Sequence, residues 1–180
     1  MENKILLHAC CAICSSYPIE HLFSLGYNPL VYFYNPNIYP QSEYEIRLEA
    51  QKKLCDYYGC ELIIGDYNQK EYFDYVKGYE NEPEKGLRCD LCFNMRLEKT
   101  AQKAKSLGIN DFTTSIVISP HKSFSKISEI GMKVAEIYDI NYVAIDFKKK
   151  DGFLKTNQIS RQLDLYRQNY CGCKYSLRKD

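Results

Sequence analysis

The fold is decided by the stretch Lys4-Ile5-Leu6-Leu7-His8-Ala9-Cys10-Cys11-Ala12-Ile13-Cys14. Its apolar first half has the length of a buried strand. Three cysteines follow where this strand is expected to end and a helix to begin. In open α/β sheets, the crevice at the carboxyl ends of the strands is where ligands bind. We therefore expect the three cysteines to lie at the mouth of a ligand site.

Further apolar segments alternate with helix-like segments along the chain. Strands are predicted at residues 30–34, 61–64, 112–118 and 142–145. Helices are predicted at residues 18–25, 42–58, 92–107, 125–138 and 160–169. This alternation is typical of an α/β fold with a parallel sheet. A chain of 180 residues is long enough for a sizeable core, so we expect one domain over residues 1–180.

Composition and hydropathy exclude a membrane protein. No apolar run reaches the length of a membrane span, and the apolar run at residues 5–7 is too short for a signal peptide. We therefore expect a cytoplasmic protein without a membrane partner. Structural disulfides are rare in that compartment, so the nine cysteines favour metal or redox chemistry.

Positive charge is concentrated near the end of the sequence. Residues 148–180 contain nine Lys or Arg and three Asp, a net charge of +6, whereas the rest of the chain carries −5. Such a region on a near-neutral protein is typical of a local contact with a polyanion. A solvated surface without a partner is the alternative, and the sequence does not separate the two.

Two further cysteine pairs, Cys89-x-x-Cys92 and Cys171-Gly172-Cys173, lie far from the first group in sequence. Four thiolates from two pairs suit either tetrahedral zinc or an iron–sulfur cluster. Structural zinc sites use pairs spaced by two to four residues, whereas Cys10 and Cys11 are adjacent, so the pattern favours iron–sulfur. Buried cysteines without any ligand are the alternative.

The Cys171-Gly172-Cys173 pair has two interpretations. It can close into a strained and easily reduced disulfide, as a redox-active pair does, or it can bind metal with the other cysteines. Cys14 also has two interpretations. It can be a ligand of an additional iron, or a helix residue without a ligand role. We interpret His8 as a hydrogen-bonded structural residue and His21 as a surface residue.

Six motifs together resemble the cobalamin-independent epoxyqueuosine reductases. They occur in family order at residues 8–14 (HACCAIC), 34–38 (YNPNI), 86–92 (GLRCDLC), 112–114 with 119–120 (FTT and SP), 146–149 (DFKK) and 166–173 (YRQNYCGC). They span nearly the whole chain, which makes the resemblance specific. It implies a Rossmann-like, three-layer α/β domain similar to the nucleotide α-hydrolases, although their glycine-rich ATP motif is missing here.

The resemblance also implies an activity and its residues. The enzyme would reduce epoxyqueuosine at the wobble position of tRNA to queuosine, the last step of queuosine synthesis. Carried over by position, four cysteines would hold a [4Fe–4S] cluster: Cys10, Cys11, Cys89 and Cys92. Cys171 and Cys173 would form a redox-active disulfide. The motif assigns no role to Cys14, the candidate ligand of an additional iron.

The chemistry of this reaction suits these residues. Turning an epoxide into an alkene removes the oxygen as water and consumes two electrons and two protons. An open iron site can act as a Lewis acid on the epoxide oxygen. A cluster passes electrons singly and a dithiol stores two, so an external electron donor is also implied.

Two rival functions belong to other classes. The first is a zinc-stabilised RNA-binding module without catalysis, which would be colourless. The second is a thiol–disulfide oxidoreductase that acts on proteins through Cys171 and Cys173, and it would not need Cys10 or Cys11. Metal and sulfide content after anaerobic purification separates these functions.

Overall fold

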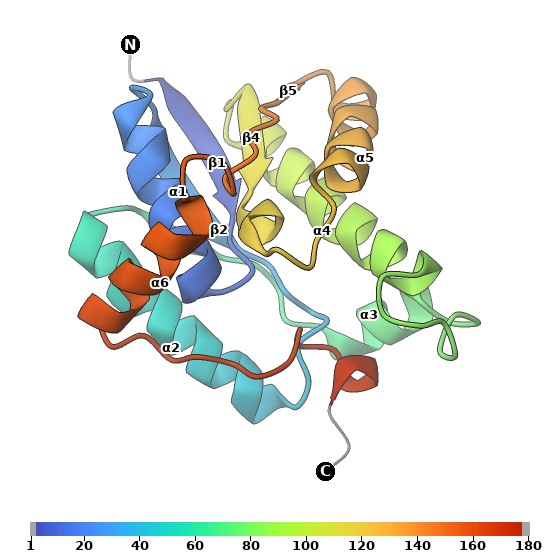
Figure 1. The fold of residues 1–180 in the computed structure, drawn as a ribbon. Helices are drawn as coiled ribbons and strands as arrows, with labels where there is room; N and C mark the ends of the chain where they lie inside the picture. The colour runs from blue at the N-terminus through green and yellow to red at the C-terminus, as the bar shows by residue number, and fades with distance from the viewer. Residues whose placement is uncertain (1–2, 178–180) are drawn as a thin grey trace.

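A five-stranded parallel sheet lies at the centre of the computed structural model, which describes residues 3–177 (Figure 1). Its strands are β1 (Lys4–His8), β2 (Asn28–Phe33), β3 (Leu62–Ile64), β4 (Asp111–Thr114) and β5 (Asn141–Tyr142). Their order across the sheet is β3-β2-β1-β4-β5, and every neighbouring pair is parallel. This order is typical of Rossmann-like folds. The predicted parallel α/β sheet is confirmed, with the opening stretch as its central strand.

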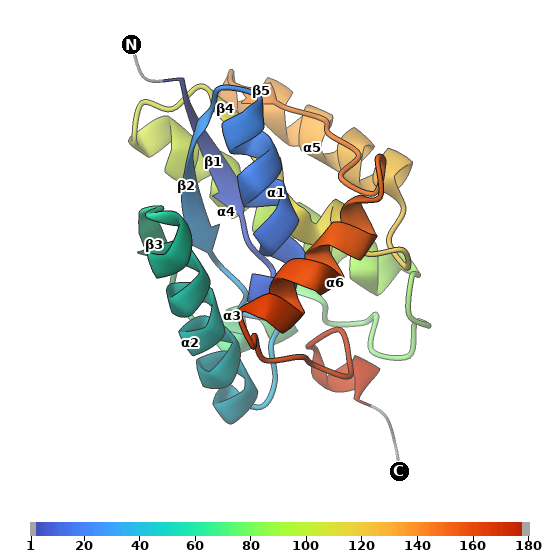
Figure 2. The ribbon, with the colours of Figure 1, turned by 60° about the vertical axis from the view of Figure 1, so that its left-hand side comes forward.

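Helices cover both faces of the sheet. They are α1 (Ala12–Ser24), α2 (Gln41–Tyr58), α3 (Gln69–Tyr75), α4 (Leu87–Ser106), α5 (Phe124–Tyr138) and α6 (Gly152–Gln162), with short 3-10 helices at Ser115–Ile118 and Lys174–Ser176. The chain steps outward from β1 in two opposite directions. Because parallel crossovers are right-handed, the connecting helices fall on opposite faces. α1 packs against α2 and α6, and α4 packs against α5, which makes three layers (Figures 1 and 2).

The core gathers around the central strand. Ile5, Leu6 and Leu7 on β1 have no exposed surface, since a parallel sheet with helices on both faces buries side chains of both orientations. Each fully buried side chain of this size stabilises the fold by about 1.5–3 kcal/mol. Of the helices in residues 3–177, none combines the length and the apolar character that a membrane crossing requires.

Two element boundaries differ from the prediction at the carboxyl end of the sheet. α1 begins at Ala12 rather than at residue 18, because the side chain of Cys11 caps its first turn. β4 ends at Thr114 rather than at residue 118, because the Thr114 hydroxyl accepts the N–H of Ile116 and starts a 3-10 turn. Both differences replace predicted strand or loop by helical turns at the edge where ligands bind.

The predicted helix over residues 160–169 is wrong. α6 ends at Gln162, and residues 164–173 form an irregular segment, called here the C-terminal strap. Asp164 has a left-handed backbone with a φ of 46°, a conformation that a right-handed helix does not continue. The Cys171-Gly172-Cys173 pair therefore lies on an irregular strap and not at the end of a helix.

Candidate metal and thiol site

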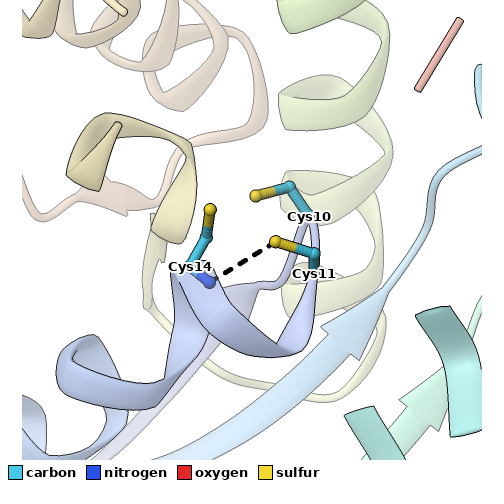
Figure 3. A group of neighbouring side chains, drawn as sticks. All are labelled: Cys10, Cys11 and Cys14. Carbon is cyan, nitrogen blue, oxygen red and sulfur yellow. Dashed lines mark hydrogen bonds between the residues drawn. The ribbon is translucent and has the colours of Figure 1, made fainter. Parts of the chain in front are cut away.

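Three cysteine sulfurs converge where β1 ends and α1 begins (Figure 3). The Sγ atoms of Cys10, Cys11 and Cys14 all lie within 4.8 Å of one another. Cys11 is the N-cap of α1 and Cys14 lies three residues on, so nearly one helical turn brings both side chains to one side. No other group of three Cys, His, Asp or Glu donor atoms within residues 3–177 meets this spacing. The cysteine triad can thus converge on one metal centre.

The surroundings of Cys11 favour its thiolate form. Its sulfur accepts the backbone N–H of Cys14 at 3.4 Å and an N–H from Nε2 of Gln168 at 2.9 Å. Side-chain hydrogen bonds with Cys10 and Cys14 hold the pKa of the Cys11 thiol well below its ordinary value, and the charge of Arg47 acts in the same direction. The thiolate is the form that ligates metals and attacks electrophiles.

His8 ties three strand ends together directly before the triad. Its Nδ1 lies 3.0 Å from the Thr114 hydroxyl, and its Nε2 lies 3.0 Å from the Tyr34 carbonyl oxygen. A carbonyl only accepts, so Nε2 carries the hydrogen. Burial lowers the pKa of His8 to about 4, so the ring is neutral near pH 7 and Nδ1 accepts from the hydroxyl. The predicted structural role of His8 is confirmed.

A cavity of about 530 Å³ opens in front of the triad. Its lining comes from six parts of the chain: Cys10, Cys11, Cys14, Arg47, Glu84, Lys85, Arg96, Ile116, Ser119, His121, Lys122, Gln168, Asn169, Tyr170, Cys171 and Ser176. It lies at the carboxyl ends of β1 and β4, the edge at which open α/β sheets bind ligands. The walls join thiols to cations, which suits an anionic substrate and electron transfer.

The remaining predicted cysteines form a second group beside this cavity. α4 begins at Leu87 rather than at residue 92, so Cys89 and Cys92 lie on its first two turns. Burial, opposed by the charge of Arg96 and assisted by the Cys171, Cys173 and Cys89 thiols, raises the pKa of the Cys92 thiol to about 11. The structure thus brings Cys89 and Cys92 close to the 171–173 pair.

All nine cysteines are free thiols in this structure. The redox-active disulfide between Cys171 and Cys173 stays a prediction. A cluster shared by Cys10, Cys11, Cys89 and Cys92 also stays a prediction. For Cys14, the geometry favours a ligand role, because its sulfur faces those of Cys10 and Cys11 (Figure 3).

Arg47 anchors the C-terminal strap to α2. Its Nη1 donates to the Cys171 carbonyl oxygen at 2.9 Å, and its Nη2 donates to that of Tyr170 at 3.1 Å. Its Nε pairs with Glu43 at 2.7 Å. The other carboxylate oxygen of Glu43 accepts the Tyr166 hydroxyl at 2.8 Å. One buried ion pair therefore fixes both ends of the strap against the cavity.

Gly172 allows the strap to pass close to Arg47. Its φ is 138°, and a Cβ there would meet Nη1 of Arg47 at 3.1 Å. Cys171 is exposed beside it and Cys173 is buried. Nζ of Lys122, from the turn after β4, lies 3.5 Å from Sγ of Cys171. The pair therefore has one sulfur open to reagents and one that is shielded.

Arg96 lies between the two thiol groups, and it is a site residue that was not predicted from the sequence. Only 4% of it is exposed, and its guanidinium interacts with the charges of Cys92, Cys171 and Cys10. A buried cation favours thiolate over thiol. A signal was present, because Arg96 follows Cys92 by four residues and so shares its face of α4. Arg47 had no such signal, since its strap contacts lie 123 and 124 residues away.

Comparison with known proteins identifies the family. The sequence model described as "Epoxyqueuosine reductase QueH" matches residues 5–179. An epoxyqueuosine reductase QueH from Histophilus somni (strain 129Pt) is 43% identical over 178 residues, which cover 98% of this chain and 73% of that relative. The identity extends over nearly the whole chain, so the match includes the triad, the second thiol group and the strap.

Two solved structures share the fold. A predicted subunit of a tRNA methyltransferase from Methanocaldococcus jannaschii has a TM-score of 0.57 at 17% identity, covering 86% of this chain and 76% of that one. The U34-tRNA thiolase NcsA from Methanococcus maripaludis, solved with its [4Fe–4S] cluster, has a TM-score of 0.57 at 14% identity, covering 99% and 63%. At these identities the likeness concerns the fold. The family model and the close relative go further: the chain belongs to the epoxyqueuosine reductase QueH family.

Proposed function

We propose that this chain reduces epoxyqueuosine at the wobble position of tRNA to queuosine, the last step of queuosine synthesis. The observation that carries the proposal is the match to the reductase family over residues 5–179, together with a thiol-lined cavity at the ligand-binding edge of the sheet. With tRNA as its substrate, we expect the enzyme to act in the cytoplasm.

The donor set suits an iron–sulfur centre. Three sulfurs within 4.8 Å of one another match the preference of such clusters for thiolates, and the thiolase of similar fold carries a [4Fe–4S] cluster. We infer that Cys10 and Cys11 are cluster ligands together with Cys89 and Cys92, and that Cys14 binds the same centre or an additional iron beside it. When bound, the centre supplies single electrons and a Lewis-acidic iron for the epoxide oxygen.

The Cys171–Cys173 pair can supply the two electrons that the reduction consumes. The reduction breaks two C–O bonds, forms one C=C bond and releases the oxygen as water, using two electrons and two protons. Oxidation of two thiols to one disulfide delivers two electrons and two protons. An external donor then has to reduce the disulfide, which the exposure of Cys171 permits.

Charged side chains orient the substrate and hold protons. Nζ of Lys122 carries a proton 3.5 Å from Sγ of Cys171, beside the place where the thiol proton leaves. Arg96 lines the cavity, and its positive charge favours an anionic substrate there. Phe93 lies 5.6 Å from Nζ of Lys122 and shields that side of the ammonium from water.

One experiment tests the function and its rivals. The protein is purified without oxygen, its iron, sulfide and zinc are measured, and it is incubated with a reductant and tRNA that contains epoxyqueuosine. We expect iron and sulfide, a brown colour, and queuosine among the nucleosides of the digested tRNA. Zinc without iron would favour the RNA-binding module. Reduction of protein disulfides without queuosine would favour the thiol–disulfide oxidoreductase.

Variants separate the redox pair from the ligands. In Cys171→Ser and Cys173→Ser we expect unchanged iron but loss of multiple turnover, while Cys55→Ser, at a buried cysteine outside both groups, keeps both. Loss of iron in parallel with activity would show that the pair ligates metal, and the electron-storage role would be wrong.

A further inference from the structure

A second cavity, of about 310 Å³, lies between α1 and the segment that follows β5. Its walls include Tyr17, His21, Phe147, Lys149 and Lys150. It shares no lining residue with the thiol cavity, and the proposed reduction does not involve it. We call it the basic cavity, because Lys149 and Lys150 both line it.

Lysine charge around the basic cavity is not neutralised. Lys149 and Lys150 line it, and Nζ of Lys155 lies 5.0 Å from the ring centre of Tyr17 in its wall. In the part of the chain that the structure describes, none of these three lysines forms an ion pair with a carboxylate. A cavity with several unpaired cations lowers the free energy of an anion within it.

His21 is held in the wall by aromatic contacts. Its ring stacks on Tyr17, with centroids 5.5 Å apart, and meets the edge of Phe147 at 6.0 Å. Burial lowers the pKa of His21, and the charges of Lys150 and Lys155 lower it further. The imidazole is therefore a fixed group that feels both lysines, and it reports on any anion that enters.

The acidic residue in the wall is already engaged. Asp146 accepts the backbone N–H of Lys148 at 3.2 Å and lies 3.7 Å from Nζ of the same residue. Lys148 in turn donates to the carbonyl oxygens of Val117 and Lys122, at 3.0 and 3.2 Å. The three consecutive lysines 148–150 thus divide: the first braces the wall of the thiol cavity, and the other two face the basic cavity.

We propose that the basic cavity binds a backbone phosphate of the tRNA substrate. The assignment rests on the proposed function and adds a second contact to it. His21 follows Ala12 by nine residues on α1, which corresponds to about 14 Å along the helix. A polynucleotide with one nucleotide in the thiol cavity can therefore place a nearby phosphate here. Lysine–phosphate contacts of this kind position a nucleic acid without reading its sequence.

Two double variants, each of which removes two lysine charges, test the site. The double variant Lys149→Gln, Lys150→Gln is compared with Lys105→Gln, Lys133→Gln, which removes the same charge from α4 and α5 on the other face of the sheet. The probe is a synthetic RNA hairpin without epoxyqueuosine, titrated at several salt concentrations. We expect the first variant to bind roughly ten- to a hundredfold more weakly at 0.1 M salt, with the slope of log K against log salt reduced by about two. We expect the control variant to bind like the unmodified protein.

Two outcomes overturn the proposal. One is an unchanged affinity and salt slope in Lys149→Gln, Lys150→Gln, or an equal loss in the control variant. The other comes from NMR of the His21 imidazole: if inorganic phosphate shifts its signals but the hairpin does not, the cavity serves a small phosphate and not RNA. Because the hairpin carries no epoxide, these results are independent of the reductase activity. A different result would overturn only the proposed function. In that result the unmodified protein forms no queuosine, while Lys149→Gln, Lys150→Gln still lowers RNA affinity and the salt slope as expected for a phosphate site.

Discussion

The cysteine triad and the C-terminal strap face the same cavity but are held in different ways. The triad lies within five residues, between a strand that is buried from Ile5 to His8 and the first turn of a helix, and only 2% of Cys11 is exposed. The strap has no regular structure, and its position depends on side chains from α2, with Arg47 reaching the Cys171 carbonyl across 124 residues of sequence. Backbone geometry defines the first region, and a few polar contacts define the second.

This difference matches the two tasks that we propose for these regions. Metal ligands have to stay at fixed separations, and sites on helices and strands keep their geometry better than sites on loops. A dithiol that opens and closes has to change the distance between its sulfurs at each turnover. On an irregular strap this change leaves the sheet undisturbed, because local opening costs least where few backbone hydrogen bonds are made.

The largest expected effect is on iron binding, and its absence would contradict the difference drawn between the triad and the strap. In Cys11→Ser we expect nearly all bound iron and sulfide to be lost, because an alcohol is a poor replacement for a thiolate ligand. In Cys171→Ser we expect the iron content of the unmodified protein. Iron and sulfide are measured after anaerobic purification, with folding checked by circular dichroism. The same assay on Cys14→Ser and Cys89→Ser defines the ligand set, and full retention in Cys89→Ser would remove the second pair from it.

A smaller effect is expected at the anchor of the strap. Arg47→Ala leaves the Glu43 carboxylate buried without its partner and removes two hydrogen bonds to the strap, so we expect the free energy of unfolding to fall by about 3–5 kcal/mol. Urea denaturation measures it. Lys53→Ala is the control, because Lys53 also donates to a strap carbonyl, that of Asp164 at 3.3 Å, but from an exposed position; we expect a loss below about 1 kcal/mol. Equal losses would mean that the strap is held by its own packing and not by Arg47.

The smallest effect concerns one glycine of the strap. Gly172→Ala has to adopt a φ of 138° and displace Nη1 of Arg47, so we expect it to destabilise the protein by about 1–3 kcal/mol. Gly26→Ala is the matched control, because its φ is also positive, at 82°, but a Cβ there meets nothing within 4 Å. The difference between the two variants isolates the contact with Arg47. If they are equally destabilised, Arg47 moves aside freely and the strap is looser than its contacts indicate.

The sequence predicts the parts of the molecule that depend on local pattern. Apolar runs and the helix signals between them predict the parallel sheet, and the family motifs predict the family, both of which are confirmed. The early start of α1 was missed because Cys11 caps the helix with its sulfur, whereas the usual capping residues carry oxygen. The position of the Cys14 sulfur depends on that same turn, so the sequence leaves the role of Cys14 open between an iron ligand and a helix residue.

Long-range contacts explain the remaining errors. The strap was taken for a helix because its conformation comes from Arg47 and Tyr39, whose N–H donates to the Gly172 carbonyl at 2.8 Å, and not from its own residues. Arg47 lies within the helix predicted over residues 42–58, where nothing in the local sequence sets it apart. No local pattern distinguishes an arginine that faces solvent from one that hydrogen-bonds a segment more than a hundred residues away.

The hydrogen bond from Gln168 to Cys11 joins residues 157 positions apart, and this separation has a consequence for biosynthesis. At ribosomal speeds of about 5–20 residues per second, roughly 8–30 s pass between the synthesis of these two residues. During that interval the nascent chain carries the thiols of Cys10, Cys11 and Cys14 without the strap that later covers them. If the triad binds iron as we propose, its thiols are therefore open both to a donor of iron and to oxidants until the last helix and the strap are made.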